Sequence, residues 1–236
     1  MLLQIKNINS YYGESHVLHN VSLEVKNNQV VSILGRNGVG KSTILKSIMG
    51  IVTPRSGSIK FKNKELVGKA PFRIARNGLG YVPEERRIFP GLTVRENLIM
   101  GKKPNGSKKD SGGWSISSIY DLFPVLGKRD KTLAANLSGG EQQILTLSRT
   151  LMGNPELILI DEPSEGLSPM MTKLIFDLID NIHNNGMSVI LVDQNLYLTC
   201  NTAQKVYVIS KGEIVYSGTG KEVLENKDIQ ASYLAV

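Results

Sequence analysis

Residues 35–43 read Gly35-Arg36-Asn37-Gly38-Val39-Gly40-Lys41-Ser42-Thr43, which matches the pattern G-x-x-x-x-G-K-[ST]. The apolar run Val30–Leu34 precedes this stretch and is suited to a buried strand. Apolar residues at helical spacing follow it, namely Ile44, Leu45 and Ile48. The glycines let the backbone curl with its N–H groups pointing inward, and the helix N-terminus adds positive potential. The stretch therefore predicts a strand–loop–helix unit that binds phosphate.

Two side chains of this loop have predicted roles at a nucleotide. We expect Lys41 to reach the β- and γ-phosphates and Ser42 to ligate Mg²⁺. The alternative is a glycine-rich turn that carries a lysine by chance. The strand before the loop and the helix after it favour the phosphate-binding interpretation.

A second apolar strand ends in acidic residues. Leu157–Ile160 is followed by Asp161 and Glu162, and ligands gather at the carboxyl ends of strands in sheets of this kind. Asp161 is expected to hold Mg²⁺, directly or through water. Glu162, one residue further, can polarise the attacking water as a general base. Many strands end in acidic turns, so this signal depends on the glycine-rich loop beside it.

The segment Leu137–Gln143 predicts a capped helix whose N-terminus is lined by glycine. Ser138, Gly139 and Gly140 form this end, and Ser138 with Glu141 makes a capping box. One chain does not need two phosphate-binding helix ends for one ATP. The economical interpretation is that the second end serves an ATP held by another subunit, and the alternative is an ordinary helix start.

The remaining pattern indicates an α/β fold. Alternating apolar residues before residue 26 predict antiparallel strands, and the last third alternates strand, helix and strand, which indicates a parallel sheet. The helix over Met171–His183 is expected to bury five side chains: Leu174, Ile175, Leu178, Ile179 and Ile182. Val206–Ser210 and Glu213–Tyr216 predict a hairpin. Roughly residues 88–155 form a mostly helical insertion, which a capping box at Thr93 opens.

Composition excludes several classes of protein. The chain has 236 residues, 41% of them hydrophobic, and 28 basic against 21 acidic residues give a formal charge of +7. These values exclude disorder, collagen and coiled coil as descriptions of the whole chain. No apolar run approaches the roughly 20 residues of a membrane span, and the N-terminus has no signal-peptide pattern, so we expect a soluble, cytoplasmic chain. The one cysteine, Cys200, excludes an internal disulfide and is expected to be packed rather than reactive.

In this order, the phosphate loop, the segment Leu137–Gln143 and the Asp161-Glu162 element resemble the ATP-binding subunits of ATP-binding cassette (ABC) transporters, over nearly the whole chain. The resemblance implies a P-loop NTPase core with an N-terminal antiparallel β subdomain, a helical insertion carrying the signature motif, and one domain over 1–236. It also implies ATP hydrolysis with Mg²⁺ and an adenine stacked on Tyr12. The implied assembly is a head-to-tail dimer beneath two membrane permeases, at the cytoplasmic face of the membrane.

Three positions depart from the usual family pattern. Glu84 stands where most members carry glutamine, Ser168 where they carry aspartate, and Gln194 where they carry histidine. Together they resemble the smaller ATPase subunit of branched-chain amino-acid importers, which works with a solute-binding protein and a second ATPase subunit, here expected to be a paralogue. Related urea and amide importers look similar. We expect Glu84 to ligate the metal, Glu162 to remain the catalytic base, and Gln194 to position groups around it.

Two rival functions are weighed against solute import. The basic charge allows a cassette ATPase that acts on nucleic acid or ribosomes, but the chain has one cassette, no long heptad insertion and no concentrated basic tail. A nucleotide-dependent interaction module without hydrolysis is disfavoured by the intact Glu162. Arg86 and Arg87 are either contacts to a phosphate or partner, or an exposed basic turn, and their spacing does not decide between these.

Overall fold

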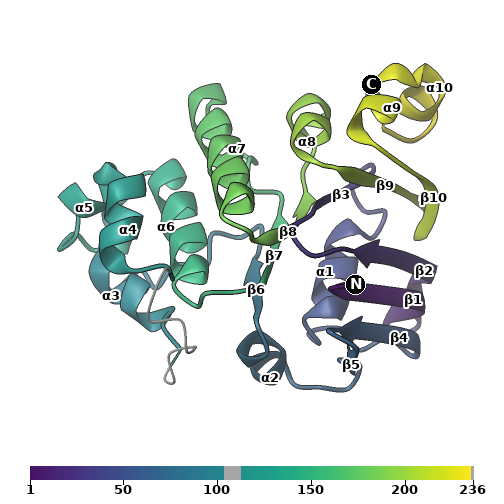
Figure 1. Ribbon diagram of the computed structural model, residues 1–236, viewed down its shortest axis with the longest axis horizontal. Helices are drawn as coiled ribbons and strands as arrows, with labels where there is room; N and C mark the ends of the chain where they lie inside the picture. The colour runs from purple at the N-terminus through teal and green to yellow at the C-terminus, as the bar shows by residue number, and fades with distance from the viewer. Residues whose placement is uncertain (104–112, 235–236) are drawn as a thin grey trace.

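Two β-sheets with helix α1 (Lys41–Ile48) packed between them organise the computed structural model of the chain (Figure 1). The structure describes residues 1–103 and 113–234. The smaller sheet is antiparallel, with strand order β2-β1-β4-β5. Its strands are β1 (Leu3–Tyr12), β2 (Ser15–Val25), β4 (Ser56–Phe61) and β5 (Lys64–Glu65). This sheet confirms the predicted antiparallel β region at the N-terminus.

The larger sheet carries the strands that end at the candidate site. Its order is β10-β9-β3-β8-β7-β6, in which β9, β3, β8, β7 and β6 run parallel and β10 is antiparallel to β9. The strands are β3 (Val30–Leu34), β6 (Leu79–Val82), β7 (Leu157–Asp161), β8 (Ser188–Val192), β9 (Lys205–Ser210) and β10 (Glu213–Gly218). The buried strands β3, β7 and β8 confirm the predicted parallel core, and β9 with β10 confirms the predicted hairpin.

The four helices described within residues 88–103 and 113–155 stand together at the end of the molecule away from the small sheet (Figure 1). They are α3 (Val94–Met100), α4 (Ile116–Leu122), α5 (Pro124–Lys128) and α6 (Gly139–Leu151). The remaining helices are α2 (Pro71–Arg76), α7 (Pro169–Asn184), α8 (Leu196–Thr202), α9 (Gly220–Glu225) and α10 (Lys227–Ile229). A 3₁₀ turn at Ala134–Asn136 and a π turn at Gln230–Leu234 complete the described elements.

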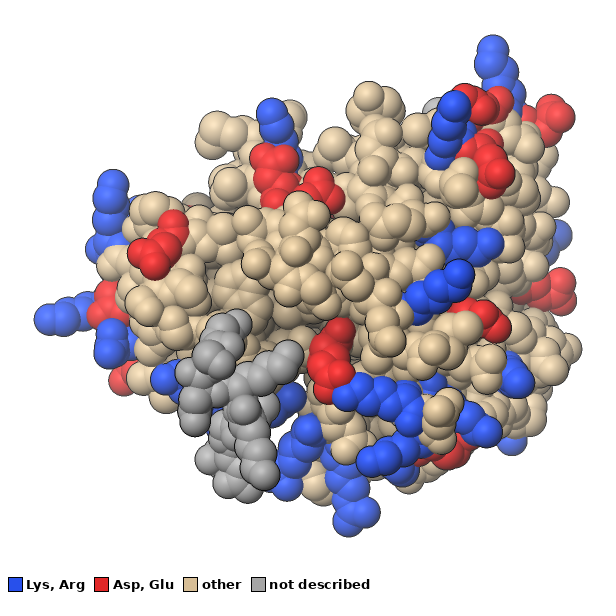
Figure 2. Space-filling view, in the orientation of Figure 1, with Lys and Arg blue, Asp and Glu red and all other residues tan. Residues whose placement is uncertain are grey.

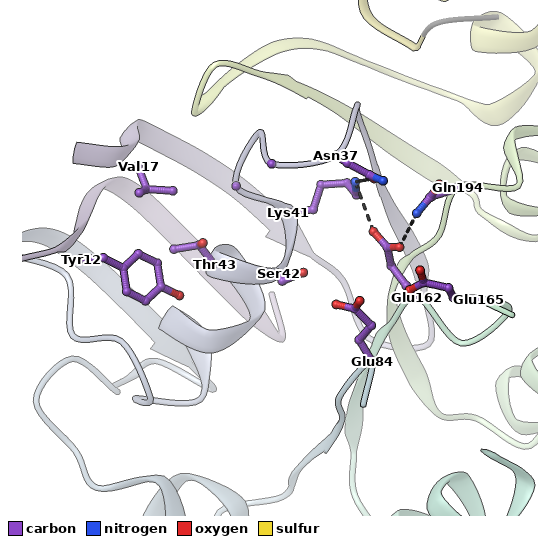
Figure 3. A pocket seen from close by; sticks show the side chains of 12 residues that line it. Tyr12, Val17, Asn37, Lys41, Ser42, Thr43, Glu84, Glu162, Glu165 and Gln194 are labelled. Atoms are coloured by element: carbon purple, nitrogen blue, oxygen red, sulfur yellow. Dashed lines mark hydrogen bonds and ion pairs between the residues drawn. The ribbon is translucent and has the colours of Figure 1, made fainter. Parts of the chain in front are cut away.

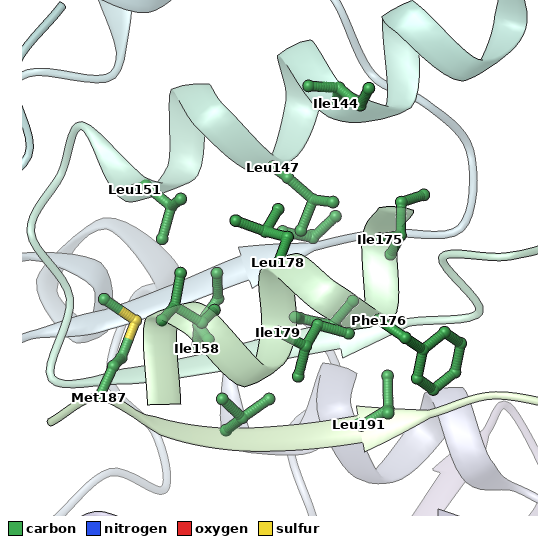
Figure 4. Close-up of a cluster of buried hydrophobic side chains, with 14 of the residues drawn as sticks. Ile144, Leu147, Leu151, Ile158, Ile175, Phe176, Leu178, Ile179, Met187 and Leu191 are labelled. Carbon is green, nitrogen blue, oxygen red and sulfur yellow. The ribbon is translucent and has the colours of Figure 1, made fainter. Parts of the chain in front are cut away.

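Two hydrophobic cores hold these layers together. One lies between the two sheets, where α1 contributes Ile44, Leu45 and Ile48. The other packs α6 and α7 against β7 and β8, and its side chains interlock across the helix–sheet interface (Figure 4). Burying side chains of this size contributes about 1.5–3 kcal/mol each. In both cores, helices pack against the faces of the large sheet. The carboxyl ends of its strands are not covered by these helices and form the site.

Helix boundaries follow the predicted caps. The side chains of Thr93 and Ser138 each accept a hydrogen bond from the backbone N–H of the glutamate three residues later. The carboxylate of that glutamate accepts from the backbone N–H of the cap residue, so both capping boxes are confirmed. One burial prediction is wrong: Leu174 on α7 is 39% exposed, because it lies at the edge of the apolar face, while Phe176, which was not predicted, is buried. Strand β6 and helix α2 were also not predicted; both are short, and β6 contains a glycine.

In the view of Figure 2 the charged side chains lie mainly around the margins, the centre is largely uncharged, and Lys and Arg gather most densely over α2 and the β4–β5 region. Among the described residues, no helix has the length and apolar character that a bilayer crossing requires. Cys200 is buried on α8, and burial raises the pKa of its thiol to about 11, which confirms that it is packed.

The segment between β6 and α3 is fixed by one buried amide. Asn97 is fully buried; its Oδ1 accepts from Phe89 N at 2.9 Å, and its Nδ2 donates to the carbonyl oxygens of Phe89, Leu92 and Thr93. Arg149 on α6 donates to the same Oδ1 at 3.4 Å and lies over the Phe89 ring at 4.7 Å. The turn after β6 is therefore joined to both α3 and α6.

We predict that Asn97→Ala lowers the free energy of unfolding by about 1–3 kcal/mol, because buried backbone groups of the turn lose their partners. Urea unfolding followed by circular dichroism measures this. Asn181→Ala on the exposed face of α7 is the matched control and is expected to change stability by no more than about 0.5 kcal/mol. An Asn97→Ala protein as stable as the control would contradict the prediction.

Candidate functional site

Four neighbouring parallel strands deliver the site residues. Strand β3 leads into the loop 35–40, β7 ends at Asp161, β8 precedes Asp193 and Gln194, and β6 precedes Glu84. Since parallel strands share one carboxyl edge, residues far apart in sequence meet there. The resulting pocket has a volume of about 460 Å³ (Figure 3).

Lys41 occupies the centre of the phosphate loop. Its ammonium donates to the carbonyl oxygens of Gly35 at 3.0 Å and Arg36 at 3.1 Å, and it lies 3.3 Å from the carboxylate of Glu162. The Lys41 side chain is 3% exposed, so this cation is almost fully desolvated. Gly40, with φ of 110°, ends the loop; an added Cβ there would approach Leu18 to 2.8 Å, so both conformation and space require glycine.

Ser42 and Asp161 lie in contact at the floor of the site. The Ser42 hydroxyl donates to Asp161 at 2.9 Å, and the Tyr81 hydroxyl donates to the other carboxylate oxygen at 3.2 Å. Burial raises the pKa of Asp161, while these two hydrogen bonds act in the opposite direction. The paired oxygens join α1 to the end of β7.

Glu162 is held from two sides. Gln194 Nε2 donates to one carboxylate oxygen at 2.5 Å, and Lys41 lies against the other (Figure 3). The backbone of Glu162 has φ of 44°, a left-handed conformation that costs a non-glycine residue about 1–3 kcal/mol. Its N–H donates to the carbonyl oxygen of Val192 at 2.7 Å, so the β7–β8 pairing maintains this conformation and aims the carboxylate into the pocket.

Two further carboxyl groups face the same space. Burial raises the pKa of Glu84, and so do a hydrogen bond to Glu165 and the negative charge of that residue. Glu165 was not among the predicted site residues. Its place three residues after Glu162, in the same loop, is the sequence signal that could have identified it. The loop is fixed to β8 because Ser164 donates to the buried Asp193 through both its N–H and its hydroxyl.

The structure thus gathers most of the predicted site residues in one pocket. Tyr12, 48% exposed, stands at its edge beside Val17 (Figure 3). The predicted residues that line it are Tyr12, Asn37, Gly38, Gly40, Lys41, Ser42, Thr43, Glu84, Glu162 and Gln194. Gly35, Arg36, Val39 and Asp161 are not on its surface: Arg36 points outward to the carbonyl oxygen of Ala231, and Asp161 lies behind Ser42.

The signature residues are not brought to this pocket. Ser138, Gly139 and Gly140 begin α6, and none of them lines the pocket described around Lys41. Gly140 is buried, and an added Cβ there would approach Met171 to 2.7 Å. The N-terminus of α6 is therefore a separate place from the N-terminus of α1, which lies at the pocket.

The oxygen ligands at the floor fit a magnesium ion bound together with a phosphate. Among the described residues, no three His, Cys, Asp or Glu side chains form a metal cluster. Magnesium bound with nucleotides commonly uses one or two protein oxygens, waters and phosphate oxygens, so an all-protein cluster is not required. The Ser42 and Asp161 oxygens provide such a pair, and Glu84 faces the same pocket.

Comparison with known proteins agrees with this geometry. The ABC transporter family model matches residues 18–165. The chain is 40% identical, over 99% of both chains, to the high-affinity branched-chain amino acid transport ATP-binding protein BraG of Pseudomonas aeruginosa. It is 32% identical, over 97% of both chains, to a probable branched-chain amino acid transport ATP-binding protein, LivF, of Archaeoglobus fulgidus. The lipopolysaccharide export ATP-binding protein LptB of Escherichia coli K12 is 30% identical over 98% of this chain and 96% of its own.

Solved structures extend the agreement to three dimensions. A nucleotide-free ATP-binding cassette from an ABC transporter superposes with a TM-score of 0.83 at 28% identity, covering 97% of this chain and 96% of its own. Another ABC transporter cassette, in its ADP conformation, gives the same TM-score at 26% identity, with coverage of 98% and 97%. Family model, relatives and fold agree with a pocket built for a nucleotide, and the chain belongs to the ABC transporter family as an ATP-binding, ATP-hydrolysing subunit.

Proposed function

We propose that the chain hydrolyses ATP to drive the import of branched-chain amino acids through separate membrane subunits. The observation that carries the choice of solute is the 40% identity, over 99% of both chains, to BraG of Pseudomonas aeruginosa. The lipopolysaccharide export relative matches at 30%, and urea or amide import remains the alternative within transport. A role on nucleic acid is not favoured by any described feature of the site.

Each site residue has a proposed role that its contacts support. Lys41 binds the β- and γ-phosphates, and the N–H groups of residues 35–43 surround them. Tyr12 stacks on the adenine. Glu162 accepts a proton from the attacking water, since its carboxylate is held at the pocket surface by Gln194. Gln194 orients that carboxylate and does not itself transfer a proton.

Magnesium is the proposed metal, held by Ser42 and Asp161, with Glu84 as a third oxygen ligand directly or through water. The Ser42–Asp161 contact of 2.9 Å supports this set, because the Asp161 carboxylate lies directly behind the Ser42 hydroxyl, which lines the pocket. When bound, the ion neutralises negative charge on the phosphate oxygens.

We further propose a head-to-tail dimer, in which Ser138, Gly139 and Gly140 complete the ATP site of a second ATPase subunit. The separation of these residues from the pocket around Lys41 supports this arrangement. The second subunit is proposed to be a paralogue. The whole chain, 1–236, is proposed as one domain with a helical subdomain over roughly 88–155.

Docking to two membrane permeases is proposed for the segment Glu84–Leu98 and its surroundings, at the cytoplasmic face of the membrane. Exposed apolar side chains support this location: Phe89 is 44% exposed, and Ile99 and Met100, beside the segment on α3, are 45% and 60% exposed. An extracytoplasmic solute-binding protein is part of the proposed full system.

The proposed solute is tested by reconstituting the chain with its permeases, second ATPase subunit and binding protein in vesicles. We predict that leucine, isoleucine or valine stimulates ATP hydrolysis and uptake, and that urea and short amides do not. The Glu162→Gln assembly, which binds ATP without turnover, is the control for uptake without hydrolysis. Stimulation by urea alone would refute the branched-chain assignment and leave the ATPase assignment standing.

We predict that Lys41→Ala weakens ATP binding about 10- to 100-fold, because a charge-assisted contact to phosphate is worth about 1.5–3 kcal/mol. Calorimetric titration with ATP measures the affinity, and circular dichroism checks that the fold is retained. Lys60→Ala, which removes an exposed lysine from β4, is the matched control and should bind ATP normally. Normal binding and hydrolysis by Lys41→Ala would refute the proposed phosphate site.

For the catalytic pair, Glu162→Gln is predicted to trap an ATP-bound dimer, since the base is lost while ATP contacts remain. Gln194→Ala should raise the activation free energy of single-turnover hydrolysis by about 2–4 kcal/mol, because Glu162 loses its orienting donor. Gln194→His should retain substantial activity, as an imidazole N–H can replace the amide donor. If Gln194→Ala reacts as fast as wild type in the assembled complex, this chain's ATP site is not the working one.

A further inference from the structure

Arg86, in the turn after β6, reaches the loop that follows the catalytic strand. Its Nη2 donates to the backbone carbonyl oxygen of Glu165 at 3.0 Å, and the side chain is half-buried. The neighbouring Glu84 and Glu165 itself both line the pocket around Lys41 (Figure 3). The turn after β6 is therefore attached to the backbone of Glu165 through Arg86.

The other side of the Arg86 guanidinium lies against the start of α6. An added Cβ at Gly139 would lie 2.5 Å from its Nη1, and one at Gly166 would lie 3.3 Å from its Nη2. The guanidinium thus fills the space that side chains at these two positions would need. Three segments distant in sequence meet at this one group: the turn after β6, the loop 162–168 and the N-terminus of α6.

The charge of Arg86 adds to the positive end of α6. A cation at a helix N-terminus is unfavourable by itself, because the free N–H groups already carry positive potential. Nearby, Glu141 is engaged twice, by the backbone N–H of Ser138 at 2.8 Å and by Arg129 at 3.0 Å. The carbonyl oxygen of Glu165 accepts from Arg86 and holds its guanidinium beside this end of α6.

We infer that Arg86 is a positioning residue that joins the chain's own ATP pocket to the α6 end that serves the second subunit's ATP. This inference rests on the head-to-tail dimer proposed above. Through Glu165, Arg86 makes the loop 162–168 and the signature end of α6 move as one unit. Nucleotide bound at one site thereby sets the geometry offered to the other site.

Arg87 provides a matched comparison in the same turn. Its guanidinium is exposed and forms an ion pair at 3.2 Å with Glu85, which belongs to the same turn. Replacing either arginine by alanine removes one positive charge from this turn. Only the Arg86 replacement removes the contact to Glu165, so a difference between the two variants reports that contact and not the net charge.

The experiment compares Arg86→Ala, Arg86→Lys and Arg87→Ala. Amide hydrogen exchange rates of residues 138–142 and 163–167, measured on the chain without partners, test the contact of Arg86 with Glu165 and the start of α6. ATP affinity of the same chain is measured by calorimetry. ATP-induced dimerisation with the second ATPase subunit is measured by size exclusion in the Glu162→Gln background. All variants are prepared without permeases, so docking does not enter the readout.

Arg86→Ala is expected to raise exchange in both segments about tenfold, as one charge-assisted hydrogen bond is lost. ATP affinity is expected to stay within about twofold of wild type, because Arg86 does not line the described pocket, while the ATP concentration for half-maximal dimerisation rises about tenfold. Arg86→Lys should lie between Arg86→Ala and wild type, since an ammonium restores the charge but not the fork geometry. Arg87→Ala should match wild type throughout.

The inference is overturned if Arg86→Ala and Arg87→Ala show the same amide exchange rates and the same ATP concentration for half-maximal dimerisation. If neither the parent protein nor Arg87→Ala pairs with the second ATPase subunit when ATP is added, the proposed head-to-tail dimer fails, but faster exchange confined to Arg86→Ala would still establish the connection between the two segments. If Arg86→Ala instead lowers ATP affinity by tenfold without faster exchange, Arg86 acts on the chain's own nucleotide and the inference is wrong.

Discussion

The ion pair between Lys41 and Glu162 is the contact on which the rest of the site depends. Both side chains are largely removed from water, being 3% and 10% exposed, and an isolated charge in that environment would be very unfavourable. The pair is tolerated because Lys41 also has two carbonyl oxygens and Glu162 also has the Gln194 amide. The arrangement requires β3, β7 and β8 to be in register, since these strands deliver its members.

The protein's own groups hold both charged side chains of this pair in place. The Lys41 ammonium has oxygen partners in the protein, so phosphate oxygens would exchange with them and would not meet an uncompensated cation. Glu162 is held in its left-handed conformation by the backbone of Val192, and does not depend on the ligand for its direction. Preorganised groups of this kind cost little reorganisation when the reaction begins.

Local patterns were sufficient to predict three of the four strands that deliver the site residues, namely β3, β7 and β8. The glycine loop, the acidic end of β7 and the Ser138 capping box each lie within a few consecutive residues, so their structure follows from their own sequence. The inward placement of Leu174 was wrong, because helical periodicity defines a face but not its edge. Strand β6 escaped prediction because four residues with one glycine, Leu79–Val82, give little periodicity.

What could not be predicted depends on contacts between distant segments. The meeting of Arg86, Gly139 and Glu165 involves three separate parts of the chain, and spacing alone left Arg86 open between a contact and an exposed turn. Tyr81, which donates to Asp161, belongs to the strand that was missed. The roles assigned to Glu84 and Gln194 came from resemblance, and the structure adds the partners through which those roles can be tested.

The state of Cys200 has a practical consequence for studying the assembly. The chain has one cysteine, and its thiol is buried with a pKa raised to about 11, so it is protonated and shielded at neutral pH. Thiolate is the form that reacts with maleimides and nitroxide reagents. A cysteine introduced on the surface would therefore take up a spin label or fluorophore selectively, with the natural residue left in place. Distances measured between labelled subunits would then report the opening and closing of the complex, and Cys200 would not have to be replaced.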